Sequence, residues 1–258
     1  MAVATNTIIG VAFEPAHALQ SLLSERAGPD TAADADMGAR LFKIRAADSS
    51  GRRSSASILI SKMYAARGYL TKPLSEAPEP DRITLVAVDN DVTIGTISIG
   101  FDGPERLLVD ELFEREVQPL RLAGRKMCEF TKLAVDNVVR SKRVLASLFH
   151  VAFIYAHRIR GYDSLLIEVN PRHVRYYKNL LGSTVMGTER LNPRVNAPAV
   201  LLHLDFSYVQ EQINKFGGKL SRSASGGSLY LYAFSITEEA GIAGRMQSSY
   251  SIFNAEDR

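Results

Sequence analysis

The sequence has little of several features that define common protein classes. Its 258 residues include one cysteine, Cys128, and no tryptophan. A single cysteine excludes an internal disulfide and a metal site built from several thiolates. No apolar run reaches the roughly 18 residues that a membrane-spanning helix needs. Residues 1–10 lack the basic segment and the sustained apolar core of a secretory signal peptide. We therefore expect a reducing, cytoplasmic setting without a membrane span.

Common nucleotide, hydrolase and metal motifs are also missing. The chain has no G-x-x-x-x-G-K-[ST] or G-x-G-x-x-G loop and no G-x-S-x-G elbow. Its histidines form no H-x-x-x-H or H-E-x-x-H pair, so we predict no metal site. The net charge of +3 is too small to indicate a nucleic-acid partner, and the basic clusters lack recognition motifs.

Regular hydrophobic patterns are confined to the middle of the chain. Hydrophobic residues make up 46% of the sequence and charged residues 23%, which is enough for a buried core. We expect residues 1–40 to be weakly ordered, with at most a short helix at Pro15–Ser24, and residues 41–206 to form one domain. Residues 207–258 are expected to be an extension with a Ser/Gly-rich linker, Ser221–Ser228, and then a strand, Leu229–Ile236.

Strand and helix patterns alternate within residues 41–206. We predict strands at Leu41–Ala46, Arg82–Val88, Val92–Phe101, Met127–Val135, Ser164–Val169, Thr184–Met186 and Ala199–Phe206. We predict helices that begin at Ser54 or Ser55 and that span Asp110–Leu122, Arg143–Arg160 and Pro171–Gly182. A helix joins the fourth and fifth of these strands, so they should be parallel neighbours. The fold class is therefore α/β (α+β), a mixed and mostly antiparallel twisted sheet with a central parallel strand pair and helices on both faces.

Four stretches carry a more specific pattern. They are Lys43–Asp48 with Met63–Leu70, Asp110–Phe113 with Glu129–Asp136, Val169–His173 with Tyr177 and Gly182, and Val195–Leu202. In this order they resemble the N-acyl amino acid synthases of the FeeM type. These belong to the GNAT acyltransferase superfamily and are related to the acyl-homoserine-lactone synthases. The resemblance implies a GNAT-like fold and transfer of a long-chain fatty acyl group from an acyl carrier protein thioester to a free amino acid. The donor is then the phosphopantetheine arm of the carrier protein, and no cofactor is tightly bound.

The segment from Asp136 to Arg143 bears on the acyl donor. GNAT enzymes that use coenzyme A hold its pyrophosphate with a glycine-bearing loop at this place, because bare backbone N–H groups bind anions. Here the segment has no glycine and ends in Arg140, Lys142 and Arg143. The resemblance implies that these cations dock the acidic carrier protein and the single phosphate of its arm. The alternative is a solvated run of surface charge.

Glu129 lies inside a mostly apolar strand, where a carboxylate is costly unless it is paired or functional. The resemblance implies that it takes a proton from the attacking ammonium, directly or through water. The alternative is an internal ion pair, with Arg45 or Arg125 as the partner. A β-bulge, common on this strand in GNAT enzymes, would change which residues share the face of Glu129.

The resemblance implies further site residues. Backbone N–H groups of Leu133, Ala134 and Val135 would polarise the thioester carbonyl, and Asn170 would help to bind the pantetheine arm. The carboxylate of the amino acid needs a cation, and the candidates are Arg45, Lys132 and Arg172.

A tyrosine after Asn170 is implied to protonate the leaving thiolate. Tyr176 and Tyr177 are both candidates, and Tyr177 matches the family better, although its spacing to Gly182 is one residue longer than in most GNAT enzymes. His173 is a second candidate acid or base, or a contact for the carboxylate of the amino acid. Cys128 could in principle be a nucleophile, but thiols within apolar strands are usually inert, so we assign it to the core.

Three other functions stay open from the sequence. One is an acyl-homoserine-lactone-type signal synthase, against which the lack of tryptophan counts, because that family carries matching tryptophans. The second is an N-acetyltransferase that uses coenzyme A. The third is a catalytically inactive module that binds a carrier protein or an acyl ligand, and product formation would distinguish it from an enzyme.

Overall fold

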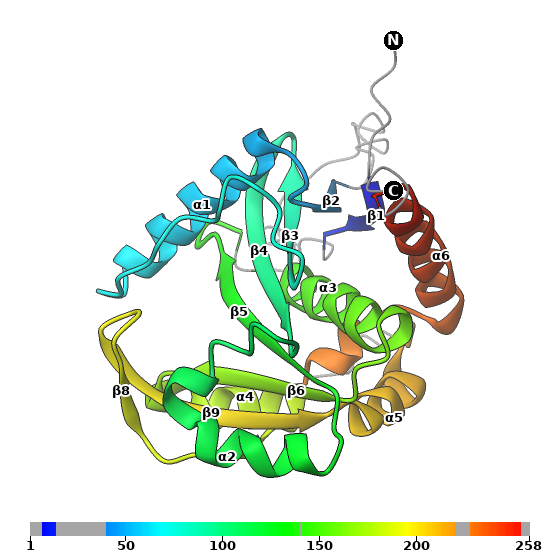
Figure 1. Cartoon of the computed structure of the whole chain (residues 1–258). Coiled ribbons are helices and arrows are strands. Elements are labelled where there is room, and N and C mark those ends of the chain that lie inside the picture. The colour runs from blue at the N-terminus through cyan, green and yellow to red at the C-terminus, as the bar shows by residue number, and fades with distance from the viewer. Residues whose placement is uncertain (1–6, 14–39, 140, 220–227, 254–258) are drawn as a thin grey trace, which may run out of the picture.

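The computed structural model describes residues 7–13, 40–139, 141–219 and 228–253 (Figure 1). In these ranges nine strands form one sheet in the order β1-β2-β3-β4-β5-β6-β9-β7, and β8 pairs with β9. All neighbours are antiparallel except β5 and β6, so the predicted fold class is confirmed. The strands are β1 Thr7–Ala12, β2 Leu41–Ala46, β3 Arg82–Asp89, β4 Val92–Phe101, β5 Met127–Val135, β6 Ser164–Val169, β7 Thr184–Val185, β8 Arg190–Asn192 and β9 Ala197–Asp205.

Helices cover both faces of this sheet. One face carries α1 (Ser50–Ala65) and α2 (Asp110–Leu122), and the other carries α3 (Lys142–Phe153), α4 (Val174–Leu181), α5 (Phe206–Phe216) and α6 (Ile236–Phe253). The described part of the chain also holds three short helical segments, η2 (Ile154–Ile159), which continues α3, η3 (Pro171–His173) and η4 (Leu229–Tyr232). Alternation along β5 sets the two cores, because Cys128 and Phe130 enter the core with α3 whereas Met127 enters the core with α2.

Most predicted elements within residues 41–206 are confirmed. The bounds of β2, β4, β5, β6 and α2 are those predicted, and Gly182 ends α4 with a left-handed φ of 77°. The predicted start of α1 is wrong by several residues. The helix begins at Ser50 because the side chain of Ser49 accepts the N–H of Arg52 and caps it.

The flanking segments contain elements that the sequence pattern did not indicate. The expectation of weak order is wrong for Thr7–Ala12, since Ile8 and Val11 are buried and the strand pairs with β2. The predicted strand Leu229–Ile236 is also wrong, because η4 occupies its first half and α6 begins at its end. A short apolar run does not by itself distinguish a strand from a buried helical segment. The predicted Pro15–Ser24 helix and residues 220–227 of the linker lie outside the described residues.

The two flanking segments contact each other. Helix α6 packs against β1 and η2, and β1 and α6 lie side by side in Figure 1. The guanidinium of Arg245 on α6 donates a hydrogen bond to the carbonyl oxygen of Ile8 on β1. Among the described helices, none combines the length and the apolar character needed to cross a membrane.

Strands β5 and β6 separate after three residue pairs, of which Glu129 with Leu166 is the last. Both strands continue, β5 along β4 as far as Val135 and β6 along β9 as far as Val169, so the sheet forks here (Figure 1). We call the space between residues 130–135 of β5 and residues 167–170 at the end of β6 the fork. Strand β5 carries a β-bulge here, because it has one residue more than β4 in this part and Lys132 has a φ of 48°.

Candidate active site

Four segments meet around the fork: the second half of β5, the end of β6, the start of α4 and the end of α1. Tyr177 of α4 packs against the same hydrophobic core as Leu133 and Val135 of β5. Its phenol also interacts electrostatically with Tyr64 and Arg67 at the end of α1, which covers the opposite face of the sheet. Tyr177 therefore lies at the fork, close to side chains from both sides of the sheet.

The predicted backbone donors lie in the part of β5 that follows the bulge. In the described residues, no strand pairs with the β6-facing edge of β5 beyond Glu129, so a ligand can reach backbone N–H groups of this edge. Leu133 and Val135 are half-buried and Ala134 is buried. The side-chain oxygen of Asn170 accepts the N–H of Arg172 at 3.2 Å and so caps η3.

Glu129 is fully buried and both of its carboxylate oxygens accept hydrogen bonds. Oε1 accepts from Nη2 of Arg82 at 2.6 Å, and Oε2 accepts from the backbone N–H of Val109 at 3.1 Å. Nη1 of Arg82 also donates to Oγ1 of Thr131 at 3.1 Å. The partner of Glu129 is thus Arg82, and the expected partners Arg45 and Arg125 are wrong.

Both expected partners of Glu129 are engaged elsewhere. Arg45 lies on β2, separated from β5 by two strands, and its Nε donates to Oγ1 of Thr7 at 3.2 Å. Arg125 donates to Oγ of Ser164 at 2.7 Å and forms an ion pair with Asp205. The structure therefore does not bring Arg45 together with Lys132 and Arg172, the other two candidates for a carboxylate-binding cation.

Lys132 and Arg172 lie on different sides of the fork. Lys132 projects from the bulge, where its Nζ is 3.5 Å from the carbonyl oxygen of Pro73, and burial lowers the pKa of its ammonium. Arg172 is exposed in η3, and its Nη2 donates to the phenolic oxygen of Tyr69 at 2.8 Å. Burial, with the nearby Arg172, lowers the pKa of His173, so this imidazole is neutral at pH 7. Its Nε2 accepts from Nε of Arg172 at 3.3 Å.

Tyr177 and Tyr176 are in different surroundings. Tyr176 is 48% exposed, whereas Tyr177 is half-buried at the fork, and the two rings meet edge to face at 5.5 Å. Burial raises the pKa of Tyr177 above its ordinary value, with Tyr64 and Tyr176 adding to the shift. The phenol of Tyr177 therefore stays protonated at neutral pH and can donate a hydrogen bond.

The N-terminus of α3 carries two of the three predicted docking cations. Lys142 is its exposed first residue and Arg143 is the next, while Arg140 lies outside the described residues. The side chain of Ser141 caps the helix by accepting the N–H of Arg143 at 3.1 Å. Nε of Arg143 is buried and has no hydrogen-bond partner within the described part of the chain. No acid lies in the first turn, so the positive end of the helix dipole is not neutralised there.

One carboxylate near the fork was missed at the sequence level. Glu168 of β6 forms an ion pair with Arg194, and Arg194 also pairs with Glu111 at 2.9 Å. Burial nevertheless raises the pKa of Glu168 to about 7. Glu168 stands in an apolar strand, as Glu129 does, so the same reasoning could have identified it.

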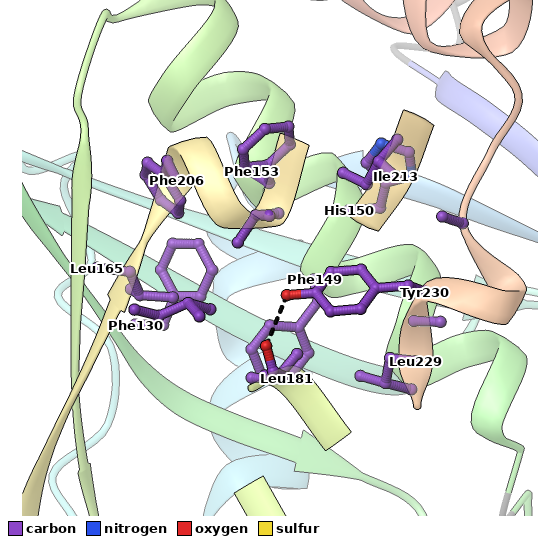
Figure 2. Close-up of a pocket in the computed structure, with 14 residues that line it drawn as sticks. Phe130, Phe149, His150, Phe153, Leu165, Leu181, Phe206, Ile213, Leu229 and Tyr230 are labelled. Atoms are coloured by element: carbon purple, nitrogen blue, oxygen red, sulfur yellow. Dashed lines mark hydrogen bonds between the residues drawn. The ribbon is translucent and has the colours of Figure 1, made fainter. Parts of the chain in front are cut away.

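An apolar pocket with a cavity volume of about 30 Å³ lies beside the fork on the α3 face (Figure 2). Phe130, the first residue after the last β5–β6 pair, and Leu165 line it from the sheet. The other lining residues are Ala146, Phe149, His150, Phe153, Leu181, Leu204, Phe206, Val209, Ile213, Leu229, Tyr230 and Ala233. Cys128 belongs to the core, as predicted, because it is fully buried and burial raises the pKa of its thiol well above the ordinary value.

The model of the family "N-acyl amino acid synthase FeeM" matches residues 55–205. The solved structure of FeeM, an N-acyl amino acid synthase from uncultured soil microbes, shares 29% identity and superimposes with a TM-score of 0.60, over 66% of this chain and 93% of that chain. Among curated proteins, none matches this chain by sequence.

Two further solved structures are more distant. A putative N-acetyltransferase from Lactobacillus plantarum shares 17% identity with a TM-score of 0.45, over 64% of this chain and 98% of that chain. The AHL synthase LasI shares 12% identity with a TM-score of 0.46, over 64% of this chain and 89% of that chain. The family match covers more than half of the chain, so this protein belongs to the N-acyl amino acid synthase FeeM family and is an acyltransferase.

Proposed function

We propose that the protein transfers a long-chain fatty acyl group from acyl carrier protein to the amine of a free amino acid, in the cytoplasm. The observation that carries the long-chain part is the apolar pocket beside the fork, lined by Phe130, Phe149 and Leu165. A hydrocarbon chain gains about 0.8 kcal/mol for each methylene group that it buries in such surroundings.

The choice of acyl carrier protein over coenzyme A is supported by the N-terminus of α3. Lys142 and Arg143 provide two cations at the positive end of a helix, and the preceding segment has no glycine to form a pyrophosphate cradle. Nε of Arg143 is buried without a partner among the described residues, and the phosphate of a phosphopantetheine arm would satisfy it. We include Arg140 in the docking surface on its sequence position alone.

The reaction forms a carbon–nitrogen bond and breaks a carbon–sulfur bond. The neutral amine attacks the thioester carbonyl carbon from about 3 Å, so that positioning supplies much of the rate. Backbone N–H groups of residues 133–135 stabilise the oxyanion, with Asn170 holding the pantetheine arm. Tyr177 donates its proton to the departing sulfur, because burial keeps its phenol protonated.

The amine must lose its proton before or during the attack. Both oxygens of Glu129 already accept hydrogen bonds, so a proton reaches this carboxylate through water and replaces one of those bonds. His173 is the second acceptor, since its imidazole is neutral at pH 7. Arg172, exposed beside His173 and Tyr69, is the first choice to bind the carboxylate of the amino acid, and Lys132 is the second.

Product analysis tests this proposal. The purified protein is incubated with long-chain acyl carrier protein and a mixture of amino acids, and the organic extract is examined by mass spectrometry. A peak of N-acyl amino acid would establish the reaction and identify the amino acid. Acylated amine from acyl-coenzyme A alone would overturn the carrier-protein part. Salt-sensitive binding of the carrier protein without any product would favour a binding module instead.

Two charge-reversal variants, compared with each other, test whether acyl carrier protein is the donor. Lys142→Glu should raise the KM for acyl carrier protein at least about tenfold, because like-charge contacts oppose docking. Its KM for a short acyl-pantetheine thioester should stay nearly the same. Lys43→Glu is the matched control, since Lys43 is an exposed lysine on β2, away from the fork. Equal effects of the two variants would contradict docking at α3.

A further inference from the structure

The pocket beside the fork is completed by residues beyond the family match, which ends at residue 205. Phe206, Val209 and Ile213 come from α5, and Leu229, Tyr230 and Ala233 come from η4 and the residue after it. In Figure 2, Phe130 and Leu165 of the sheet lie at one side of the pocket, and Leu229 and Tyr230 lie at the other. A chain that enters beside Phe130 at the fork would thus end against Leu229 and Tyr230.

Tyr230 is fixed in this position by a buried hydrogen bond. Its phenolic oxygen donates to the carbonyl oxygen of Leu181 at 2.8 Å, as Figure 2 shows. Burial raises the pKa of Tyr230 well above its ordinary value, so the phenol stays protonated at neutral pH and can donate this hydrogen bond. Leu181 is the last residue of α4, the helix that carries Tyr177. The hydrogen bond therefore joins the wall of the pocket to the helix at the fork.

A second set of contacts holds the other end of this segment. Nδ1 of His150 on α3 accepts the backbone N–H of Phe234 at 3.0 Å, and the two rings stack at 5.1 Å. Nε2 of His150 is 3.4 Å from Oε2 of Glu239, and Oε1 of Glu239 accepts from Nε of Arg158 at 2.7 Å. Residues 229–233 are thus held in place at both ends, by Tyr230 and by Phe234.

We propose that Leu229–Ala233 is the end wall of an acyl-chain pocket and that Tyr230 sets the longest acyl chain that the enzyme accepts. The inference rests on the proposed function, in that it takes a long acyl chain as the occupant. It adds that chain length is determined by a segment outside the family match rather than by the matched residues of the sheet and α3. Family members with a different segment at this place would then differ in the chain that they transfer.

Two substitutions should move the wall in opposite directions. Tyr230→Ala removes the ring from the end of the pocket and should shift the product toward longer chains. Ala233→Leu fills space at the same end and should shift it toward shorter chains. Discrimination by one methylene group in an apolar pocket is about tenfold or more. We therefore expect the ratio of neighbouring even-length products to change by at least about tenfold in each variant.

Two control substitutions separate the wall from general damage. Tyr230→Phe keeps the ring and loses only the hydrogen bond to Leu181, so the change in its product lengths should be much smaller than that of Tyr230→Ala. Met246 is a buried residue of α6 that belongs to the same core but does not line the pocket. Met246→Ala should lower stability through loss of packing and leave the product lengths unchanged.

The experiment uses two readouts on the full chain. In the first, an equimolar mixture of acyl carrier proteins, loaded with saturated acyl chains of increasing even length, competes for one amino acid. The products are identified and quantified by mass spectrometry. In the second, saturated free fatty acids of the same lengths are titrated calorimetrically into each variant. Binding does not require catalysis, so this readout also serves a variant that folds but does not turn over.

The outcomes distinguish the inference from the function on which it rests. Shifts of the preferred length in both variants, longer for Tyr230→Ala and shorter for Ala233→Leu, support the wall. Unchanged lengths in both variants with normal product formation overturn the wall and leave the function intact. Shifted fatty-acid binding without an N-acyl product from any donor overturns the function and supports the wall. Wild-type protein that binds no fatty acid of the series overturns the inference.

Discussion

The guanidinium of Arg82 on β3 reaches across the intervening strand β4 and donates a hydrogen bond of 2.6 Å to the carboxylate of Glu129 on β5. The contact passes Gly100 of β4, where an added Cβ would lie 2.7 Å from Nη2 of Arg82 and 2.8 Å from Oε1 of Glu129. The side chain of Arg82 is 15% exposed and that of Glu129 is fully buried. Burying both charges is costly, but removing one partner costs more, about 3–5 kcal/mol.

Replacing Glu129 with glutamine tests its role in proton transfer. An amide of the same shape cannot accept the proton of the amine, so we expect lower turnover at neutral pH. Turnover should recover partly at high pH, where more of the amino acid carries a neutral amine. The pH dependence of kcat checks this, at a temperature where circular dichroism shows both proteins folded. A variant with wild-type activity over the whole pH range would exclude Glu129 as the base.

Replacing Gly100 with alanine tests the ion pair without changing either charged residue. The new methyl group would push Arg82 and Glu129 apart, so we expect a loss of stability of about 3 kcal/mol, together with lower turnover. Denaturant unfolding measures the loss. Gly10→Ala is the matched control, because an added Cβ at Gly10 of β1 meets no atom within 4 Å. Equal stability of the two variants would mean that the pair adjusts to the methyl group at little cost.

The ion pair between Arg82 and Glu129 depends on some features that could be predicted from the sequence and on others that could not. The bounds of β4 and β5 followed from alternation and hairpin signals, whereas the resemblance raised a bulge on β5 without placing it at Lys132. The need of Glu129 for a partner followed from the cost of a buried charge. The identity of that partner did not follow, because it depends on which strand lies beyond β4 and on the absence of a side chain at Gly100.

The predictions for the flanking segments were wrong for a different reason. Leu229–Tyr232 is apolar and aromatic because it packs against α3 and α5, and burial alone does not specify backbone conformation. The spacing of Phe206, Val209 and Ile213 is a helical signal for α5 that was present in the sequence. Tyr177, His173 and Arg172 lie around one helix start, where the pattern after Asn170 predicted a helix, whereas the position of Arg45 depended on the strand order, which the sequence left open.

Replacing Tyr177 with phenylalanine tests proton donation to the sulfur. General acid catalysis typically contributes about 10²–10⁴-fold, so we expect kcat with acyl carrier protein to fall at least about a hundredfold. A thiophenyl ester, whose leaving group needs no proton, should lose much less. Tyr176→Phe is the control, since Tyr176 is exposed. If both esters lost activity equally, Tyr177 would be a packing residue rather than an acid.

Replacing Glu168 with glutamine tests the raised pKa of this carboxyl. Its pKa rises from 4.5 to about 7 on folding. Between pH 4.5 and pH 7 the folded protein therefore keeps a proton on Glu168 that the unfolded chain has lost. The stability from this group is fully present below about pH 4.5 and is lost as the pH rises through about 7. Relative to Glu168→Gln, the wild type should lose about 3 kcal/mol of unfolding free energy across this window.

Denaturant unfolding at a series of pH values measures this difference. Arg194 keeps an ion pair with Glu111 in the variant, so it is not left without a partner. Glu114→Gln is the control, because the side chain of Glu114 is 57% exposed. A constant difference between wild type and Glu168→Gln from pH 4.5 to 8 would show that Glu168 titrates normally in the folded protein.

The hydrogen bond from Arg245 to Ile8 has a consequence for the order in which the molecule is made. It joins residues 237 positions apart, so β1 leaves the ribosome long before the helix that packs against it. Contacts between distant residues form late, because the chain entropy of closing a long loop opposes them. The sheet and α3 can assemble earlier around contacts that are closer in the sequence. On a growing chain, the cavity beside the fork would likewise stay open at one end until residues 229–233, which line that end, have been synthesised.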